Sequence, residues 1–350
     1  MVRSGLARRF LGSSVPPFRH LQPAEQLDRL DEVVDALLPR YDLAPAGRTL
    51  LQFENNAVFQ VVATSGERFV VRVAPPWGRG AAEQRSELQW LESLRLETGL
   101  AVPGPVRNRL GELNTTVQLP GSGEAHPCVV LRWVAGEPPE PGLAPAAMEQ
   151  VGAFVAGLHR SAERFRPGPG FVRPRWDWER LCGPGSILHD GAVLRTLAPP
   201  ERSILRAAGE RTRRVLAGPD RPAWEVGLIH ADLHRDNILL SPAGVGAIDF
   251  DDCGFGFFLY DLACILESFE RRVFADPAER RAGREALLEG YAEVRPLAPD
   301  FAESLGVFTA LRHLAILDFI LRSPNPTVHE WGRPRVAAII AQIQVDLGGG

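Results

Sequence analysis

The sequence contains no lysine: its 39 positively charged side chains, histidine apart, are all arginines. A role that proteins usually give to a lysine ammonium must therefore be filled by the planar, forked guanidinium of arginine, or go unfilled. The formal net charge is −4 at pH 7 and no basic run is present. Because nucleic-acid-binding proteins concentrate positive charge on one face, we expect no nucleic-acid partner.

Cysteine and long apolar runs are also scarce. The four cysteines form no C-x-x-C pair, so we expect free thiols in a reducing cytoplasm rather than a zinc site or a disulfide framework. No apolar run approaches the roughly 18–20 residues of a membrane-spanning helix. The first residues carry arginines but lack the continuous apolar core of a secretory signal. We therefore expect no membrane partner and a cytoplasmic location.

What the chain does contain is one stretch, 228–252, that gathers polar residues around a predicted β-hairpin. Two short apolar runs flank the turn-forming Ser-Pro-Ala-Gly at 241–244, which is typical of a hairpin with a four-residue loop. Counting outward from the turn brings Asn237 and Asp249 side by side at the open end. Asp232 lies in the loop just upstream, so one loop and one hairpin gather three polar side chains.

These three side chains match the needs of phosphoryl transfer from ATP. That reaction uses a carboxylate to accept the proton of the attacking hydroxyl and oxygen ligands to hold Mg²⁺ against the phosphates. The pattern His-x-Asp-x-x-x-x-Asn from His230, followed by Asp249 after an apolar run, has the order of the kinase catalytic loop and metal-binding aspartate. We predict Asp232 as the catalytic base, Asn237 and Asp249 as Mg²⁺ ligands, and His230 as a brace for the loop. Each residue alone would be ordinary in a turn or helix cap, so the combination carries the prediction.

The segments HADLHRDNILL and AIDFDDCGFGFFLYDLA resemble the aminoglycoside phosphotransferase family, which also contains choline-kinase-like and homoserine-kinase-like enzymes. The resemblance implies an α+β, two-lobed protein-kinase-like fold with a small β-rich N-lobe and a larger, mostly helical C-lobe. We expect an N-terminal helical extension at 1–47, a nucleotide-binding N-lobe at 48–134 and a catalytic, substrate-binding C-lobe at 135–350. The resemblance also implies that Asp261 holds the catalytic-loop backbone, although a helix N-cap suits this residue equally well.

The nucleotide site implied by this resemblance falls in the first half of the chain. Three strands are predicted within 50–73 and a helix over 81–96. Arg72 lies on the third strand, where a kinase carries its ATP-binding lysine, and a guanidinium can bind phosphate oxygens. The alternative is an exposed strand arginine. Glu83 and Glu87 share one helix face, and we predict Glu87 as the partner of Arg72, unless both are solvated helix charges.

Two further segments complete the expected nucleotide site. The Glu54-Asn55-Asn56 turn stands where the family covers the phosphates, and it contains no glycine. Asparagine tolerates left-handed conformations and turns tightly, so Asn55 and Asn56 stay candidates for phosphate contact. The apolar run 128–134 with its Gly/Pro-rich exit is typical of a hinge between lobes. By resemblance, the adenine would bind the backbone at Arg132, Trp133 and Val134.

The rest of the chain is predicted to be largely helical, with a Pro-, Gly- and Trp-rich insert at 166–198 that could shape the substrate pocket. His159 falls at the end of a predicted helix, where we expect a structural histidine. His313, beside Arg312 in another predicted helix, either reaches the site or packs as a structural histidine, and we favour packing. The acidic residues after the hairpin predict either an acidic mouth for a small cation or solvated helix-end charges. These residues are Asp251, Asp252, Glu267 and Glu270.

The sequence does not identify the acceptor. A small-molecule hydroxyl on an aminoglycoside, other antibiotic or amino sugar is the first expectation, with ATP and Mg²⁺ as cofactors. A metabolic small-alcohol kinase for homoserine or choline is the second, and a stress-type Ser/Thr protein kinase the third. The non-enzyme alternative is a nucleotide-binding scaffold that has lost catalysis.

Overall fold

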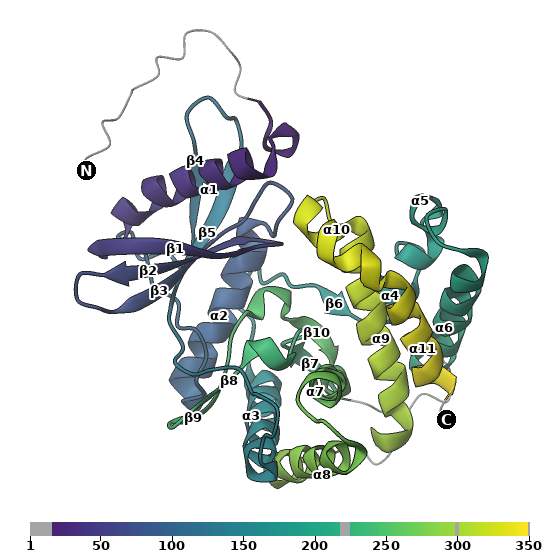
Figure 1. Ribbon diagram of the computed structural model, residues 1–350. Helices are drawn as coiled ribbons and strands as arrows, with labels where there is room; N and C mark the ends of the chain where they lie inside the picture. The colour runs from purple at the N-terminus through teal and green to yellow at the C-terminus, as the bar shows by residue number, and fades with distance from the viewer. Residues whose placement is uncertain (1–15, 218–224, 298–300, 349–350) are drawn as a thin grey trace.

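The computed structural model describes residues 16–217, 225–297 and 301–348, and the chain divides into the two expected lobes (Figure 1). The N-lobe contains an antiparallel sheet in the order β1-β2-β3-β5-β4. Its strands are β1 (Pro45–Phe53), β2 (Ala57–Ala63), β3 (Arg68–Val73), β4 (Thr115–Gln118) and β5 (Ala125–Arg132). The three strands predicted within 50–73 are confirmed, although β1 begins earlier, at Pro45.

Two helices flank this sheet. Helix α1 (Pro23–Leu37) packs its apolar side on the sheet, and its Leu30 and Val34 share a core with Phe59 and Val71 of the strands. Strand β2 alternates buried and half-buried residues because its side chains point to opposite faces. Helix α2 (Ala81–Thr98), which confirms the helix predicted over 81–96, instead buries Leu88, Leu91 and Leu94 in a cluster that continues into the C-lobe. The N-lobe is therefore joined to the C-lobe through α2.

The C-lobe is mostly helical and carries two small sheets. Its longer helices are α3 (Pro145–Arg164), α6 (Pro199–Ala217), α7 (Phe258–Arg272), α8 (Pro277–Val294), α9 (Phe301–Arg322) and α11 (Val336–Gly348). The shorter ones are α4 (Trp178–Cys182), α5 (Gly191–Leu194) and α10 (Pro326–Gly332). One small sheet has the order β6-β10-β7 and the other is β8-β9. Their strands are β6 (Arg175–Trp176), β7 (Val226–Ile229), β8 (Ile238–Ser241), β9 (Gly244–Ala247) and β10 (Gly254–Phe257).

Helix α9 corrects one expectation. By length and composition alone it is apolar enough to cross a membrane, whereas the sequence suggested that no such stretch exists. The helix packs against α7, α11 and α6, and more than half of its most apolar window is buried. It also carries Arg312 and His313, both of which form ion pairs with other helices or loops. Helix α9 is apolar because it packs in the core of the C-lobe.

Helices α3 and α8 approach each other through glycine. A Cβ atom added at Gly152 would lie 2.0 Å from the carbonyl oxygen of Leu287, and one added at Gly290 would lie 2.0 Å from that of Glu149. Side-chain rotation cannot relieve a clash with backbone. Only glycine at these positions allows the two helices to pack at this distance.

We predict that Gly152→Ala lowers the melting temperature by several degrees, because overpacking typically costs about 1–3 kcal/mol. Gly157→Ala in the same helix is the matched control, since its Cβ would meet only the Leu100 side chain at 3.4 Å. Alanine is favoured over glycine in a helix by roughly 0.8–1 kcal/mol, so this control should be neutral or stabilising. Circular dichroism melts of both variants test the prediction, and equal shifts would contradict it.

Candidate functional site

The hairpin at the centre of the sequence has the predicted register. Strands β8 and β9 pair Ile238 with Ala247 and Leu240 with Val245. The turn has two residues rather than four, because Ser241 and Gly244 also pair. Beyond the strands, the Ile248 N–H donates to the Asn237 carbonyl oxygen at 2.9 Å. This bond brings Asn237 beside the start of the Asp249 segment, as the count from the turn predicted.

The loop before the hairpin is held by Asp261 at the start of α7. Its two carboxylate oxygens accept the backbone N–H groups of His230 at 2.9 Å and Ala231 at 2.7 Å. Asp261 is completely buried, and His159 Nε2 lies 3.2 Å from it. Ala231 has φ +69°, a left-handed conformation that L-residues adopt only at a cost. The expectation that Asp261 fixes this loop therefore matches its hydrogen bonds.

His230 braces the same loop from inside. Its side chain is fully buried, and burial lowers its pKa, so the ring is neutral near pH 7. Nδ1 accepts the Asp232 N–H at 3.3 Å, which leaves the proton on Nε2 to donate to the Ile248 carbonyl at 2.9 Å. The ring packs on Phe250 with centroids 4.4 Å apart. These bonds tie the loop to the hairpin and match a bracing role.

Asp232 is the carboxylate that this frame presents to the cleft. Arg312 Nη2 donates to its Oδ1, Asn237 Nδ2 lies 3.2 Å from its Oδ2, and His234 Nε2 lies 3.5 Å from the same atom. Burial alone would raise the pKa of Asp232, but the charges of Arg312 and His234 outweigh it and hold the pKa below its usual value. Asp232 is therefore ionised at neutral pH.

Arg312 is a site residue that the sequence did not reveal. It comes from α9, 80 positions beyond Asp232 in the chain. The one indication in the sequence was an arginine in the middle of an apolar helix, because a buried charge requires a partner.

The neighbouring His313 contacts other helices: its Nδ1 lies 2.8 Å from Asp346 of α11 and its Nε2 lies 3.5 Å from Glu267 of α7. His313 thus joins three helices, in line with the expected structural role.

Asp249 and Asn237 are placed as a pair of oxygen donors. Asp249 adopts φ +61°, and burial together with the nearby Asp251 charge raises its pKa to about 7. No arginine or histidine within the described part of the chain forms an ion pair with it. The Asn237 amide nitrogen bonds the Asp232 carbonyl at 2.9 Å, which leaves the amide oxygen free. One carboxylate and one amide oxygen suit a hard cation, which would draw its other ligands from phosphates and water.

A buried ion pair crosses the N-lobe beside this centre. Arg72 Nη1 and Nη2 donate to the two Glu87 oxygens at 3.0 and 2.5 Å, with Arg72 3% and Glu87 0% exposed. The predicted partner of Arg72 is thus Glu87, whereas Glu83 pairs with Arg79 at 3.2 Å. Arg72 Nη2 also lies 3.6 Å from Asp251. The guanidinium therefore links a strand, a helix and the segment after Asp249.

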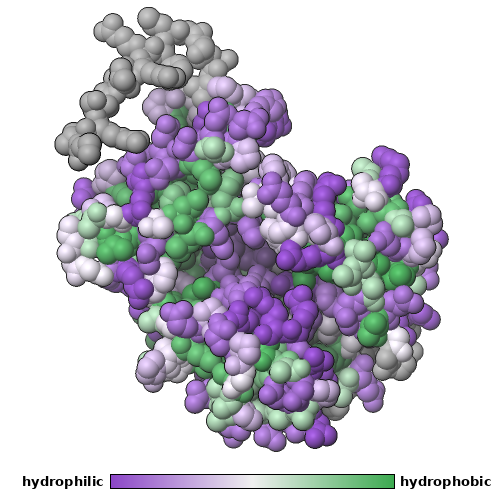
Figure 2. Space-filling view, in the orientation of Figure 1, coloured by the Kyte–Doolittle hydropathy of each residue, from purple (hydrophilic) through white to green (hydrophobic). Residues whose placement is uncertain are grey.

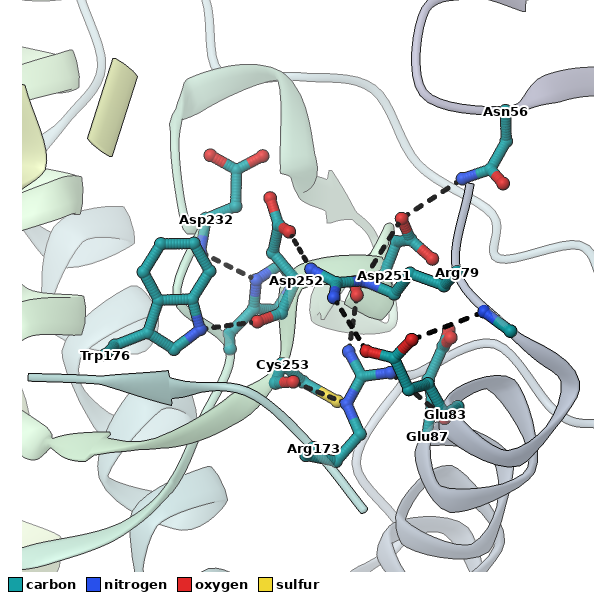
Figure 3. A network of polar contacts seen from close by, with 12 residues as sticks. Asn56, Arg79, Glu83, Glu87, Arg173, Trp176, Asp232, Asp251, Asp252 and Cys253 are labelled. Atoms are coloured by element: carbon teal, nitrogen blue, oxygen red, sulfur yellow. Dashed lines mark hydrogen bonds and ion pairs between the residues drawn. The ribbon is translucent and has the colours of Figure 1, made fainter. Parts of the chain in front are cut away.

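The four acids for which we left open an acidic mouth or solvated helix-end charges all line the cleft, and each has an arginine partner. Figure 3 shows Asp251 and Asp252 in a network with Arg79 and Asn56, while the Asp232 side chain lies outside it. Arg79 Nη2 lies 2.5 Å from Asp252 and its Nε 3.6 Å from Asp251.

The two helical acids of that set also have basic partners. Glu267 lies 3.0 Å from Arg271, and Glu270 lies 2.5 Å from Arg284. The Glu267–Arg271 pair has the i, i+4 spacing that a helix sequence reveals. The sequence could not show that arginines from other elements pair with Asp251, Asp252 and Glu270.

The Glu54-Asn55-Asn56 turn is tied to the C-lobe. Asn56 is buried and donates to Asp251 Oδ2 at 3.1 Å, while Asn55 is exposed. The side chain of Asn325, which caps α10, donates to the carbonyl oxygens of Phe53 at 3.2 Å and Glu54 at 2.8 Å. Of the two asparagines predicted to contact phosphate, Asn56 thus already uses its side-chain donor in a hydrogen bond to Asp251. Asn55 stays open to the cleft.

The linker after β5 borders the opposite side of the cleft. The Trp133 N–H donates to Arg68 at 3.2 Å, and the Arg132 side chain pairs with Glu67 outside. The Val134 N–H has no acceptor among the described residues, so it is available to a ligand. Gly136, with φ +137°, passes so close to β8 that a Cβ would lie 2.9 Å from the Leu240 carbonyl oxygen.

One cleft between the lobes, with a volume of about 2010 Å³, is lined by the predicted site residues Asn55, Arg72, Asp232, Asn237 and Asp249. Figure 2 shows it as a hollow lined mainly by hydrophilic residues. Its volume exceeds the roughly 300–1,000 Å³ of a typical small-molecule site, so two ligands fit side by side. The linker and β1–β3 form one end. Helices α7, α9, α10 and α11 form the other, with Asp232 between them.

Three comparisons with known proteins agree with this geometry. Residues 48–297 match the model of the phosphotransferase enzyme family. A homoserine kinase from Pseudomonas aeruginosa is 30% identical over 276 residues, which cover 77% of this chain and 79% of that protein. The structure of the microcompartment-associated aminopropanol kinase superposes with a TM-score of 0.73 and 28% identity, covering 90% of this chain and 95% of that one.

A further solved structure extends the agreement in fold. The amicoumacin kinase in complex with AMP-PNP, Ca²⁺ and Ami has a TM-score of 0.73 and 20% identity, covering 92% of this chain and 96% of that one. At this identity the likeness concerns the fold. The predicted two-lobed, kinase-like architecture is confirmed.

His313 generates a prediction about stability. Burial alone would lower its pKa, but hydrogen bonds to Asp346 and Glu267 raise it above the ordinary 6.5. A raised folded-state pKa stabilises the protein fully below the unfolded value, and the contribution is lost as pH rises through the folded value. His313→Gln should therefore lower the melting temperature more at about pH 6 than at about pH 9. His20→Gln, at an exposed position, is the control. A pH-independent difference for His313→Gln would contradict the prediction.

Proposed function

The chain belongs to the phosphotransferase enzyme family, and from this premise we propose that it transfers the γ-phosphate of ATP to the hydroxyl of a small amine-bearing metabolic alcohol. The family assignment makes it a phosphotransferase with an alcohol acceptor. The observation that carries the proposal is the Asp232 carboxylate, fixed at the middle of the cleft with Asn237 and Asp249 beside it. The relatives named for homoserine and aminopropanol favour a metabolic alcohol over the aminoglycoside first expected.

Asp232 acts on the acceptor hydroxyl in this mechanism. Because Arg312 and His234 keep it ionised, its free lone pairs accept a hydrogen bond from the hydroxyl and aim the oxygen at the γ-phosphorus. As the new O–P bond forms and the bond to ADP breaks, the hydroxyl proton passes to Asp232. The transition state of phosphoryl transfer is loose, so the proton moves late and a weakly basic, well-oriented carboxylate suffices.

Asn237 and Asp249 would hold Mg²⁺, for which the free amide oxygen and the otherwise unpaired carboxylate are suitable donors. The ion would neutralise charge that develops on the phosphates. Arg72 would supply the positive charge that the usual lysine brings to the phosphates. Its outer Nη atoms are already engaged with Glu87, so it contributes a fixed positive charge beside the phosphates rather than a mobile contact.

The adenine would lie against the linker formed by Arg132, Trp133 and Val134, with the Val134 N–H as the available donor. Asn55 would contact the phosphates from the N-lobe, since the side chain of Asn56 is hydrogen-bonded to Asp251.

In another chain, the absence of the usual ATP-binding lysine would favour a nucleotide-binding scaffold without catalysis. Here no lysine occurs at any position, and Asp232, Asn237 and Asp249 lie together, so we favour the enzyme.

An antibiotic acceptor is the second candidate. The cleft volume of about 2010 Å³ exceeds what ATP and a very small alcohol require, and the fold matches a kinase solved with Ami.

The four cysteines are free and buried, and we place the reaction in the cytoplasm, where ATP is available and thiols stay reduced.

We predict that Asp232→Asn lowers kcat by at least roughly 10²-fold, because it removes the hydrogen-bond acceptor and proton acceptor of the attacking hydroxyl. The variant should still bind ATP, since Asp232 lies on the acceptor side. Mass spectrometry of phosphorylated products tests this with homoserine, amino alcohols, choline and aminoglycosides as acceptors. ATP-induced shifts in melting temperature serve as the binding control. Turnover of Asp232→Asn at the wild-type rate would refute the base assignment.

We also predict a role for Arg312 that depends on guanidinium shape. Arg312→Met should lower kcat by roughly 10–10²-fold, since small displacements of a reacting group are costly, and leave KM for ATP unchanged. Arg312→Lys should recover only part of the loss, because an ammonium keeps the charge without the planar fork. Steady-state kinetics of both variants provide the measurement. Equal activity of Lys and Met variants would argue against an ionic role.

A further inference from the structure

The acids that line the cleft fall into two groups. Most of them form ion pairs with arginine or histidine in the described residues. Three lining acids, Asp249, Glu137 and Glu54, form none. Asp249 lies at the proposed cation site, and Glu137 is in the linker at the nucleotide end. Glu54 is therefore the unpaired acid that the mechanism has not used.

Glu54 lies at the junction between the nucleotide and acceptor ends of the cleft. It belongs to the β1–β2 turn, which reaches across to α10 (Figure 1). Asn325, the α10 cap, donates to the Glu54 carbonyl at 2.8 Å, and the Glu54 N–H donates to the Asn56 carbonyl at 3.3 Å. The backbone on both sides of its side chain is thus fixed. The carboxylate is half-buried and shares the cleft with Asp232 and Trp331.

The electrostatic setting of Glu54 favours a positive ligand. Burial and the negative charge of Asp232 raise the pKa of Glu54 because two carboxylates face one partly dehydrated space, while His234 and Trp331 act in the opposite direction. The charge of Asp232 is balanced by Arg312, whereas that of Glu54 is not. Arg335, which also lines the cleft, lies 5.5 Å from the Trp331 ring centre and makes no ion pair with Glu54. A cation placed there would meet a carboxylate that forms no ion pair with arginine or histidine in the described residues, beside the indole of Trp331.

We infer that the Glu54 carboxylate binds the ammonium group of the acceptor, so that the preferred substrate is a small amino alcohol whose hydroxyl reaches Asp232. This inference rests on the proposed function and adds its specificity-determining residue. Both lobes then contact the acceptor: the C-lobe positions the hydroxyl, and the phosphate-covering turn of the N-lobe holds the amine.

The experiment compares an amino alcohol, 1-amino-2-propanol, with 1,2-propanediol, in which a hydroxyl replaces the amine. For the wild type, kcat/KM should favour the amino alcohol by roughly 10–100-fold, the usual worth of a hydrogen bond to a charged group. Glu54→Gln should raise KM for the amino alcohol by a similar factor while leaving kcat/KM for the diol and KM for ATP unchanged. Glu54→Asp, which keeps the charge, should restore part of the preference.

Glu137→Gln is the matched control, because it removes the other unpaired cleft acid at the nucleotide end and should leave the acceptor preference intact. A Glu54→Gln variant that keeps the preference, or that raises KM for ATP instead, would overturn the inference while the kinase function stands. Equal use of amine and diol by the wild type would do the same. Failure of the wild type to phosphorylate any alcohol in the panel would refute the proposed function itself.

Discussion

The structure depends above all on one buried carboxylate. Asp261, at the start of α7, accepts two successive backbone N–H groups of the loop before the hairpin. A fully buried carboxylate must be satisfied by donors, and here the loop backbone supplies them. In return the loop is held with Ala231 in a left-handed conformation. That conformation presents the Asp232 side chain to the cleft and sets its distance to Asn237 and to the hairpin.

Arginine supplies the ion pairs and positive charges that other proteins divide between lysine and arginine. Arg72, Arg79 and Arg173 join the strands, α2 and the insert to the segment around Asp251. Arg312 joins α9 to Asp232 in the catalytic loop. Arg173, from the insert, donates to the Cys253 carbonyl at 2.6 Å and the Glu83 carbonyl at 3.0 Å. A guanidinium can do this because its donors point in several fixed directions. In the same network Asp251 and Asp252 form ion pairs with arginine, which reduces the negative charge that they offer to a cationic substrate.

The distribution of unpaired charge follows from that network. Most cleft acids are paired with arginine or histidine in the described part of the chain. Of the three that are not, we assign Asp249 to a cation beside the phosphates and Glu54 to a charge on the acceptor, while Glu137 lies at the nucleotide end without an assigned ligand. Total acidity near a site says little about the charge of its substrate, because short-range pairing cancels most of it.

Sequence alone determined the hairpin register, the joining of Asp232, Asn237 and Asp249, and the strand and helix that carry Arg72 and Glu87. These features depend on local periodicity and turn chemistry, which act over a few residues. The sequence could not place Arg312 on Asp232, tie Asn325 to the Glu54 turn, or bring Arg79 to Asp251 and Asp252. Those contacts join segments far apart in the chain, and only the packing of the two lobes and of α9 and α10 decides which of these groups meet.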